Sequence, residues 1–287
     1  MDVVIYGVIN AANFVLIAIG FTLVYGVTRV ANFAHGSLYI LTGFVVWTLM
    51  QKVGLNYFFT IIISVGITAV VGMLVYQLFL IRVRGMPASE IIASFAIGMG
   101  IVELLKTIGF VGSYGNPVFI HGSIQLAGVP IDYQRFIIVI LALCSVLFLL
   151  FFTRYTKTGL ALRGIAQDEQ AAMMVGINSD WSATVSLAIG SALASVAAVV
   201  ILPLGNIYPG IGYEALVYAV AVCIVGGLGS LTGTIIAGVV LAFAQMITVK
   251  FLGGEWRMLV IFLGILLILI FKPSGLFGRQ KELEERV

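Results

Sequence analysis

Charged residues are scarce in this sequence. Asp, Glu, Lys and Arg make up 9% of its 287 residues, whereas hydrophobic residues make up 61%. Soluble domains carry about 25% charged residues, so the composition excludes a soluble globular protein and places most of the chain in a lipid bilayer. The net charge of +3 is spread thinly along the predicted loops, which gives no reason to expect a nucleic-acid partner.

The residues that usually carry enzyme chemistry are also few. The two cysteines, Cys144 and Cys223, both lie in apolar runs, as is typical of small buried residues rather than of disulfides or metal ligands. The sequence has no Walker-type G-x-x-x-x-G-K-[ST] loop, so we expect no ATP hydrolysis by this chain itself. No Ser/His/Asp or Cys/His arrangement suggests a nucleophile. We therefore predict a protein that is not an enzyme and binds no cofactor.

Long hydrophobic runs are what the sequence has in abundance, and about 20 apolar residues are enough to cross a bilayer. The first run, 5–27, exceeds a signal-peptide core and follows no basic segment, so we expect it to stay in the mature protein. Run 215–249 is too long for one crossing and is interrupted at 226–230, so we divide it in two. The remaining runs are 35–50, 57–81, 91–111, 136–153, 181–204 and 258–271.

These runs predict an all-α polytopic integral membrane protein. We expect a single transmembrane domain over residues 1–287, a bundle of about eight to nine transmembrane helices with discontinuous or re-entrant segments. Basic residues favour the cytoplasmic side of membrane proteins. With the loop around Arg82 and Arg84 inside and nine alternating crossings, ten of the fifteen Lys and Arg residues lie inside and four outside. The N-terminus is then outside and the C-terminus inside, unless a re-entrant segment changes the count by one.

Two short segments open with the same three residues. Gly36-Ser37-Leu38 starts one and Gly229-Ser230-Leu231 starts the other. Glycine-interrupted segments at corresponding places in two halves often mark discontinuous helices that line a transport path. Such short matches also arise by chance in glycine-rich sequence, and both interpretations stay open. His35, beside the first break, is either an interfacial hydrogen-bonding residue or part of a pore lining.

Charge within the predicted spans is limited to Glu103 and Lys106, which are three residues apart on one helical face, where they can pair. We prefer a structural ion pair, and a role in the transport pathway is the alternative. Because there is no chain of acids and histidines across the membrane, a proton-coupled carrier is disfavoured.

Residues 156–176 form a polar, charged island between two membrane-length runs. Its composition favours helix, with an apolar stripe of Leu162, Ile165, Ala172 and Met173 that Glu169 interrupts. A helix lying on the membrane would explain this stripe. We prefer a docking surface outside the bilayer, because the Met-Met-Val cluster at 173–175 suits a partner's cleft.

Three ordered motifs carry a resemblance to a known family. They are YGVTRVANFAHG at 25–36, TGLALR at 158–163 with Asp168, Ala171, Ala172 and GIN at 176–178, and VGGLGS at 225–230 with Gly233 and Gly238. Together they resemble the LivH-type permease subunit of bacterial branched-chain (hydrophobic) amino acid ABC importers. Leu160 and Leu162 flank Ala161 where relatives often have small or basic residues, which leaves the detailed coupling geometry open.

The resemblance implies a permease subunit in the bacterial cytoplasmic (inner) membrane that imports small neutral or zwitterionic solutes, above all branched-chain amino acids. It implies three kinds of protein partner besides the lipid bilayer: a second homologous permease, two cytoplasmic ATPase subunits that hold ATP-Mg, and a periplasmic solute-binding protein. It places segment 156–178 and the tail 273–287 in the cytoplasm. The residues implied for ATPase coupling are Gly159, Arg163, Gly164, Asp168, Glu169, Ala171 and Gly176. Those implied for the translocation path are Asn32, Phe33, His35, Gly36, Gly226, Gly227, Gly229 and Ser230.

Two other classes of function remain open at this point. A passive channel for urea or amides, with re-entrant half-helices, would explain the glycine-rich breaks but not the polar island. A membrane scaffold would explain the island but would not need paired breaks.

Overall fold

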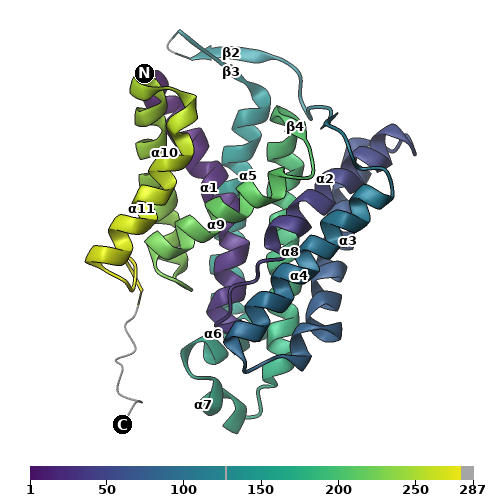
Figure 1. Ribbon diagram of the computed structural model, residues 1–287, viewed down its shortest axis with the longest axis vertical. Helices are drawn as coiled ribbons and strands as arrows, with labels where there is room; N and C mark the ends of the chain where they lie inside the picture. Colours follow the sequence, from purple (N-terminus) through teal and green to yellow (C-terminus); the bar gives the residue numbers. More distant parts are fainter. Residues whose placement is uncertain (127, 279–287) are drawn as a thin grey trace.

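The computed structural model describes residues 1–126 and 128–278 and is almost entirely helical (Figure 1). Its helices are α1 (Asp2–Thr28), α2 (His35–Gln51), α3 (Tyr57–Leu78), α4 (Pro87–Thr107), α5 (Tyr133–Tyr155), α6 (Lys157–Gln167), α7 (Glu169–Met174), α8 (Ser179–Ile201), α9 (Ile211–Gly226), α10 (Leu231–Leu252) and α11 (Arg257–Phe271). The strands are β1 (Tyr114–Gly115), β2 (Ser123–Leu126), β3 (Val129–Asp132) and β4 (Asn206–Ile207). They form two short antiparallel pairs, β1 with β4 and β2 with β3.

Seven helical segments in the described part of the chain are long and apolar enough to cross a membrane. They are Asp2–Thr28, Tyr57–Arg82, Pro87–Thr107, Tyr133–Tyr155, Ser179–Leu204, Leu231–Leu252 and Gly254–Phe271. Two further apolar helices are shorter, α2 with 17 residues and α9 with 16. Each of the nine predicted runs is thus a helix, and the division of run 215–249 falls where it was predicted, between Gly226 and Leu231. The protein is an all-α polytopic membrane protein.

α1 and α8 form the centre of the bundle. α1 packs against α10, α8, α9 and α5. Of an apolar 18-residue stretch of α1, 56% is buried, and 67% is buried in the corresponding stretch of the segment that contains α8. By contrast, only 6% of the apolar stretch Gly254–Phe271, which contains α11, is buried. Large apolar side chains on the outer helices are exposed, for example Phe58 on α3, Leu143 on α5 and Phe271 on α11. Such extensive apolar surface is typical of contact with lipid or with the membrane helices of a partner.

The loops gather at two ends of the bundle. At one end lie α6, α7, the C-terminal end of α1, the α3–α4 loop and the α9–α10 turn, and we call it the α6–α7 end. The N-terminus and the β2–β3 hairpin lie at the opposite end (Figure 1), where the Tyr6 hydroxyl donates to the Pro130 carbonyl over 3.0 Å. This arrangement of loops follows the alternation of crossings predicted from the sequence. Residues 279–287 of the predicted tail lie outside the described part.

α2 begins inside the bundle rather than at its end. α1 finishes at Thr28, but the His35 ring nitrogen Nε2 at the start of α2 lies 3.0 Å from the carbonyl of Ile17, near the middle of α1. The helix from Ile17 to Thr28 has a rise of about 16 Å. Residues 29–34 therefore run back into the bundle before α2 starts, which confirms the predicted discontinuous segment.

The starts of α2 and α9 meet at a contact between two glycines. A Cβ atom built on Gly36 would lie 2.1 Å from the carbonyl oxygen of Gly212, and one built on Gly212 would lie 2.5 Å from that of Gly36. Only glycine permits the two backbones to approach so closely. Two helices distant in the sequence thus begin side by side within the protein.

Candidate functional site

The polar island predicted at 156–176 folds as two short helices, each capped by its own side chain. The Thr156 hydroxyl accepts a hydrogen bond from Gly159 N–H (2.9 Å) at the start of α6. The Asp168 carboxylate accepts one from Ala171 N–H (3.0 Å) at the start of α7. Side-chain oxygens at these positions satisfy otherwise unpaired backbone donors. The helix therefore ends at Gln167 and begins again at Glu169, which turns the two helices in different directions.

One face of this α6–α7 segment is fixed to the bundle. Leu162, Ile165 and Ala172 are buried in a cluster with Val27 of α1. The guanidinium of Arg29, the residue that directly follows α1, donates to the carbonyl of Ala166. The predicted apolar stripe is therefore correct for three of its four members. Met173 does not belong to it, because the second helix turns this side chain outward.

The other face carries exposed apolar side chains. Met173 is 47% exposed, Met174 86% and Val175 77%. Of the residues predicted for ATPase coupling, Arg163, Asp168, Glu169, Ala171 and Gly176 are exposed, Gly164 is half-buried and Gly159 is buried. Gly159 packs tightly against the chain before it, since a Cβ there would lie 2.0 Å from the Phe152 carbonyl. The segment thus presents a partly apolar surface that the rest of this chain leaves uncovered.

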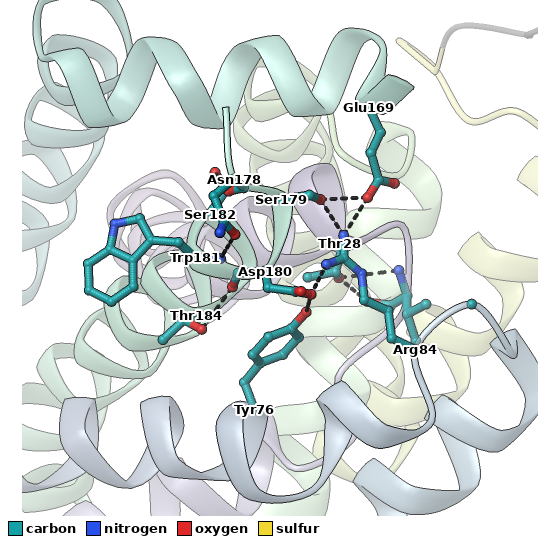
Figure 2. A network of polar contacts seen from close by, with 12 residues as sticks. Thr28, Tyr76, Arg84, Glu169, Asn178, Ser179, Asp180, Trp181, Ser182 and Thr184 are labelled. Atoms are coloured by element: carbon teal, nitrogen blue, oxygen red, sulfur yellow. Dashed lines mark hydrogen bonds and ion pairs between the residues drawn. The ribbon is translucent and has the colours of Figure 1, made fainter. Parts of the chain in front are cut away.

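Arg84, from the α3–α4 loop, links this segment to the bundle (Figure 2). Its guanidinium forms ion pairs with Glu169 at the start of α7 and with Asp180 at the start of α8, and it also donates to the Ser179 hydroxyl. The Tyr76 hydroxyl donates to Asp180 over 3.2 Å, and Ser179 donates to Glu169 over 2.5 Å. Four segments therefore meet in one hydrogen-bonded network.

The network favours the charged form of Arg84. Burial alone would lower its pKa, but Tyr76 and the carboxylates of Asp180 and Glu169 outweigh burial, so the pKa of Arg84 is raised above its ordinary value. The sequence places Arg84 on the same side as the island but does not single it out. The pairing of Arg84 with Glu169 cannot be predicted from the sequence, because a contact between residues 85 positions apart leaves no local pattern.

The residues predicted for the translocation path occupy two separate places. The first group surrounds the start of α2. Asn32 is buried and accepts from Ala34 N–H (3.1 Å), and Phe33 N–H donates to the Ser94 hydroxyl (3.1 Å). His35 is 2% exposed, with its ring edge-on to Phe21 at 5.7 Å. It holds α2 against α1, and it lines none of the cavities described below.

The second group forms the α9–α10 turn at the α6–α7 end. Gly227 and Gly229 have φ angles of +103° and +79°, which glycine adopts without strain. The Ser230 hydroxyl caps α10 by accepting from Gly233 N–H (3.1 Å). Backbone bonds from Leu276 and Phe277 tie the turn, which includes Gly226, to the segment after α11. The structure brings Gly36 to Gly212 rather than to this turn.

Three cavities are lined by residues of the α6–α7 end, of the segment between α1 and α2, and of the Gly36–Gly212 contact. The largest, which we call the vestibule, measures about 890 Å³. It is lined by Thr28, Arg29, Val30, Ile81, Arg84, Gly85, Pro87, Glu90, Glu169, Met173, Gly176, Ile177, Asn178, Ser179 and Asp180.

Two much smaller spaces, each of about 10 Å³, follow the vestibule. The inner crevice shares Thr28, Val30 and Glu90 with the vestibule and also contacts Asn32 and Ser94. The junction crevice lies beside Phe33, Gly36, Ser37 and Gly212. Each of these volumes holds at most about one water molecule. Neither of these two spaces can therefore admit a solute in this structure.

Glu90 lines two of these spaces but is not among the residues predicted for the site, because it lies just before the fourth apolar run, which begins at Ile91. A signal was present, because Pro87 followed three residues later by an acid is typical of a helix start. α4 does begin at Pro87, which places Glu90 in its first turn, buried to 8% exposure.

Comparison with known proteins agrees with this architecture. Residues 3–271 match the family described as "Branched-chain amino acid transport system / permease component". The high-affinity branched-chain amino acid transport system permease protein LivH of Salmonella typhimurium is 32% identical, over 96% of this chain and 94% of the relative. The corresponding protein BraD of Pseudomonas aeruginosa is 28% identical, with the same coverage of both chains.

A solved structure, PsaBC from Streptococcus pneumoniae in complex with Fab, has a similar fold. Its TM-score is 0.51 at 13% sequence identity, covering 96% of this chain and 94% of that chain. The family match spans all of the membrane helices and the α6–α7 segment. The chain therefore belongs to the family of branched-chain amino acid transport system permease components and is a multi-pass membrane permease.

Proposed function

We propose that this chain is the membrane-spanning permease subunit of an ABC importer for branched-chain amino acids in the bacterial inner membrane. The observation that supports it most is the match to permeases of this kind along almost the whole chain. The proposed assembly contains a second homologous permease, two ATPase subunits that hold ATP-Mg, and a periplasmic binding protein that delivers the solute. The α6–α7 end then faces the cytoplasm, which also accords with the excess of basic residues there.

In this proposal the ATPases dock on the exposed side of the α6–α7 segment. Met173, Met174 and Val175 are apolar and uncovered by this chain, and adaptable methionine surfaces suit protein partners. The opposite side of the segment is fixed to α1 through Arg29 and to the α3–α4 loop through Arg84. A force applied to the α6–α7 segment is therefore transmitted to the end of α1 and to the α3–α4 loop.

Residues at the end of α1 and just after the α3–α4 loop also line the inner crevice. Thr28 and Val30 lie at the end of α1, and Glu90 follows the α3–α4 loop. We infer that closure of the ATPase dimer shifts the α6–α7 segment and changes the width of the crevice, and this would couple ATP hydrolysis to alternating access. A passive channel would not account for the uncovered apolar side chains of the α6–α7 segment.

A pull-down of the tagged chain from its native membranes in mild detergent tests this assignment. We expect an ATPase pair and a second permease to co-purify with the wild-type chain. An Ala171→Lys variant, which places a bulky charge on the exposed face, should lose the ATPases while keeping the second permease. Recovery of the wild-type chain alone as a stable oligomer would overturn the proposal in favour of a channel.

A further inference from the structure

One acidic side chain that lines the vestibule forms no ion pair with any described residue. Five charged residues line it: Arg29, Arg84, Glu90, Glu169 and Asp180. Arg84 pairs with both Glu169 and Asp180, while Arg29 donates to a backbone carbonyl of α6. Among the described residues Glu90 forms no ion pair. Arg84 lies near enough to act on it electrostatically, but the Arg84 guanidinium is bound to Glu169 and Asp180.

The surroundings of Glu90 satisfy only part of its hydrogen-bonding capacity. Its Oε1 accepts from Gly85 N–H over 2.7 Å, which closes the turn before α4. A carboxylate has about four acceptor positions on its two oxygens, and a carboxylate buried without a counter-ion is costly. A turn-closing role requires only the one oxygen. The remaining acceptor positions suit a cationic ligand.

A hydrogen-bond donor lies in the same inner crevice. Asn32 is 5% exposed, and its Oδ1 accepts from Ala34 N–H. No described residue accepts a hydrogen bond from its amide nitrogen. Glu90 and Asn32 both line the crevice, so it contains an anionic acceptor and a neutral donor. An ammonium and a carboxylate on one carbon atom, the head group of an α-amino acid, match this pair.

The sizes of the spaces indicate where such a ligand is held. The inner crevice is too small for more than one water, whereas the vestibule, at about 890 Å³, lies within the range of ligand pockets. Glu90 belongs to the walls of both spaces. A solute that has passed the crevice thus meets Glu90 at the boundary with the vestibule.

We propose that Glu90 binds the ammonium group of the transported solute where the inner crevice opens into the vestibule, and that Asn32 binds its carboxylate when the crevice widens. This inference rests on the proposed function, which supplies an amino acid as the solute and places the vestibule in the cytoplasm. It assigns part of the selectivity for amino acids to the permease itself.

A cysteine reporter at Val30, which lines both spaces, tests the proposal. A chain with Val30→Cys and Cys144→Ala is assembled with its partners in nanodiscs without binding protein, and the rate at which N-ethylmaleimide alkylates the introduced thiol is measured. We expect leucine and 3-methylbutylamine, which carry an ammonium, to slow alkylation about fivefold at several times their Kd. The oxo acid 4-methyl-2-oxopentanoate, which lacks the ammonium, should not slow it.

Variants of Glu90 separate binding from structure. E90Q keeps an acceptor for Gly85 N–H but removes the charge, so protection by leucine should disappear while alkylation without ligand is unchanged. E90D should restore part of the protection. Equal protection by leucine and the oxo acid, protection that survives in E90Q, or no protection by either ammonium compound would overturn the proposal.

A second measurement distinguishes failure of the Glu90 site from failure of the proposed function. The same Val30→Cys assembly is transferred to liposomes, and its ATP-driven leucine uptake is measured with binding protein. Uptake without protection would refute the Glu90 site and leave the importer standing. Protection by 3-methylbutylamine without leucine uptake would support an ammonium site while refuting the assignment of the solute.

Discussion

Arg84 and Glu169 are joined by an ion pair that spans from the α3–α4 loop to the first residue of α7. The same guanidinium reaches Asp180 on α8. A surface ion pair alone contributes about 1 kcal/mol or less to stability. The importance of this one lies in its position, because it links the exposed α6–α7 segment to the loop that leads into Glu90 and the inner crevice.

Replacing Arg84 by lysine should therefore impair transport more than folding. Lysine keeps the charge but has no planar fork to bind two carboxylates at once. We expect ATP-driven uptake to fall about 2- to 30-fold, the range for 0.5–2 kcal/mol of coupling energy, while the elution profile in detergent stays that of the wild type. Arg82→Lys, in the same loop but exposed, is the matched control and should leave uptake unchanged. Equal losses in both variants would contradict a specific role for Arg84.

The contact between Gly36 and Gly212 makes a separate prediction about stability. Alanine at either position would force a Cβ against a backbone carbonyl, so we expect a loss of at least about 1–3 kcal/mol, as in overpacked cores. Gly66→Ala and Gly100→Ala are controls, because a Cβ at either site meets nothing within 4 Å. Thermal unfolding in detergent should separate the two pairs of variants. Similar melting temperatures for all four would show that the helix starts do not pack as described.

The exposed Met174 offers a direct probe of docking. Because it is 86% exposed, Met174→Asp should fold as well as the wild type. If the ATPases cover this side chain, the variant should lose their co-purification, whereas Met174→Leu should retain it. Retention of the ATPases by the aspartate variant would place the docking surface elsewhere on the chain.

Sequence patterns identified the helices well because each is an apolar run bounded by polar or glycine-rich residues. They also predicted the Glu103–Lys106 pair, which the structure confirms at 2.6 Å between Nζ and Oε1, since those residues are neighbours on one helix. They could not predict that Gly36 meets Gly212 or that Arg84 binds Glu169. Those contacts depend on how distant segments pack, and no local periodicity of the sequence indicates them.

The two native cysteines of the folded protein should not react with alkylating reagents. Cys223 is fully buried, and its Sγ lies 2.8 Å from the Thr22 hydroxyl. Cys144 is exposed but lies in the middle of α5, a membrane-spanning helix, where we expect lipid to keep water-soluble reagents away. We expect a membrane-impermeant maleimide to label neither in intact vesicles and both after denaturation. Rapid labelling of Cys144 in intact vesicles would indicate that water reaches this face of α5.

The most direct test of the proposed function is leucine uptake into proteoliposomes that contain this chain, its co-purified permease and ATPases, and the binding protein. We predict accumulation of leucine that requires ATP, Mg²⁺ and the binding protein, and that stops when the ATPases are omitted. Leucine flux that proceeds down its gradient through this chain alone, with no need for ATP or partners, would contradict the assignment as an importer subunit.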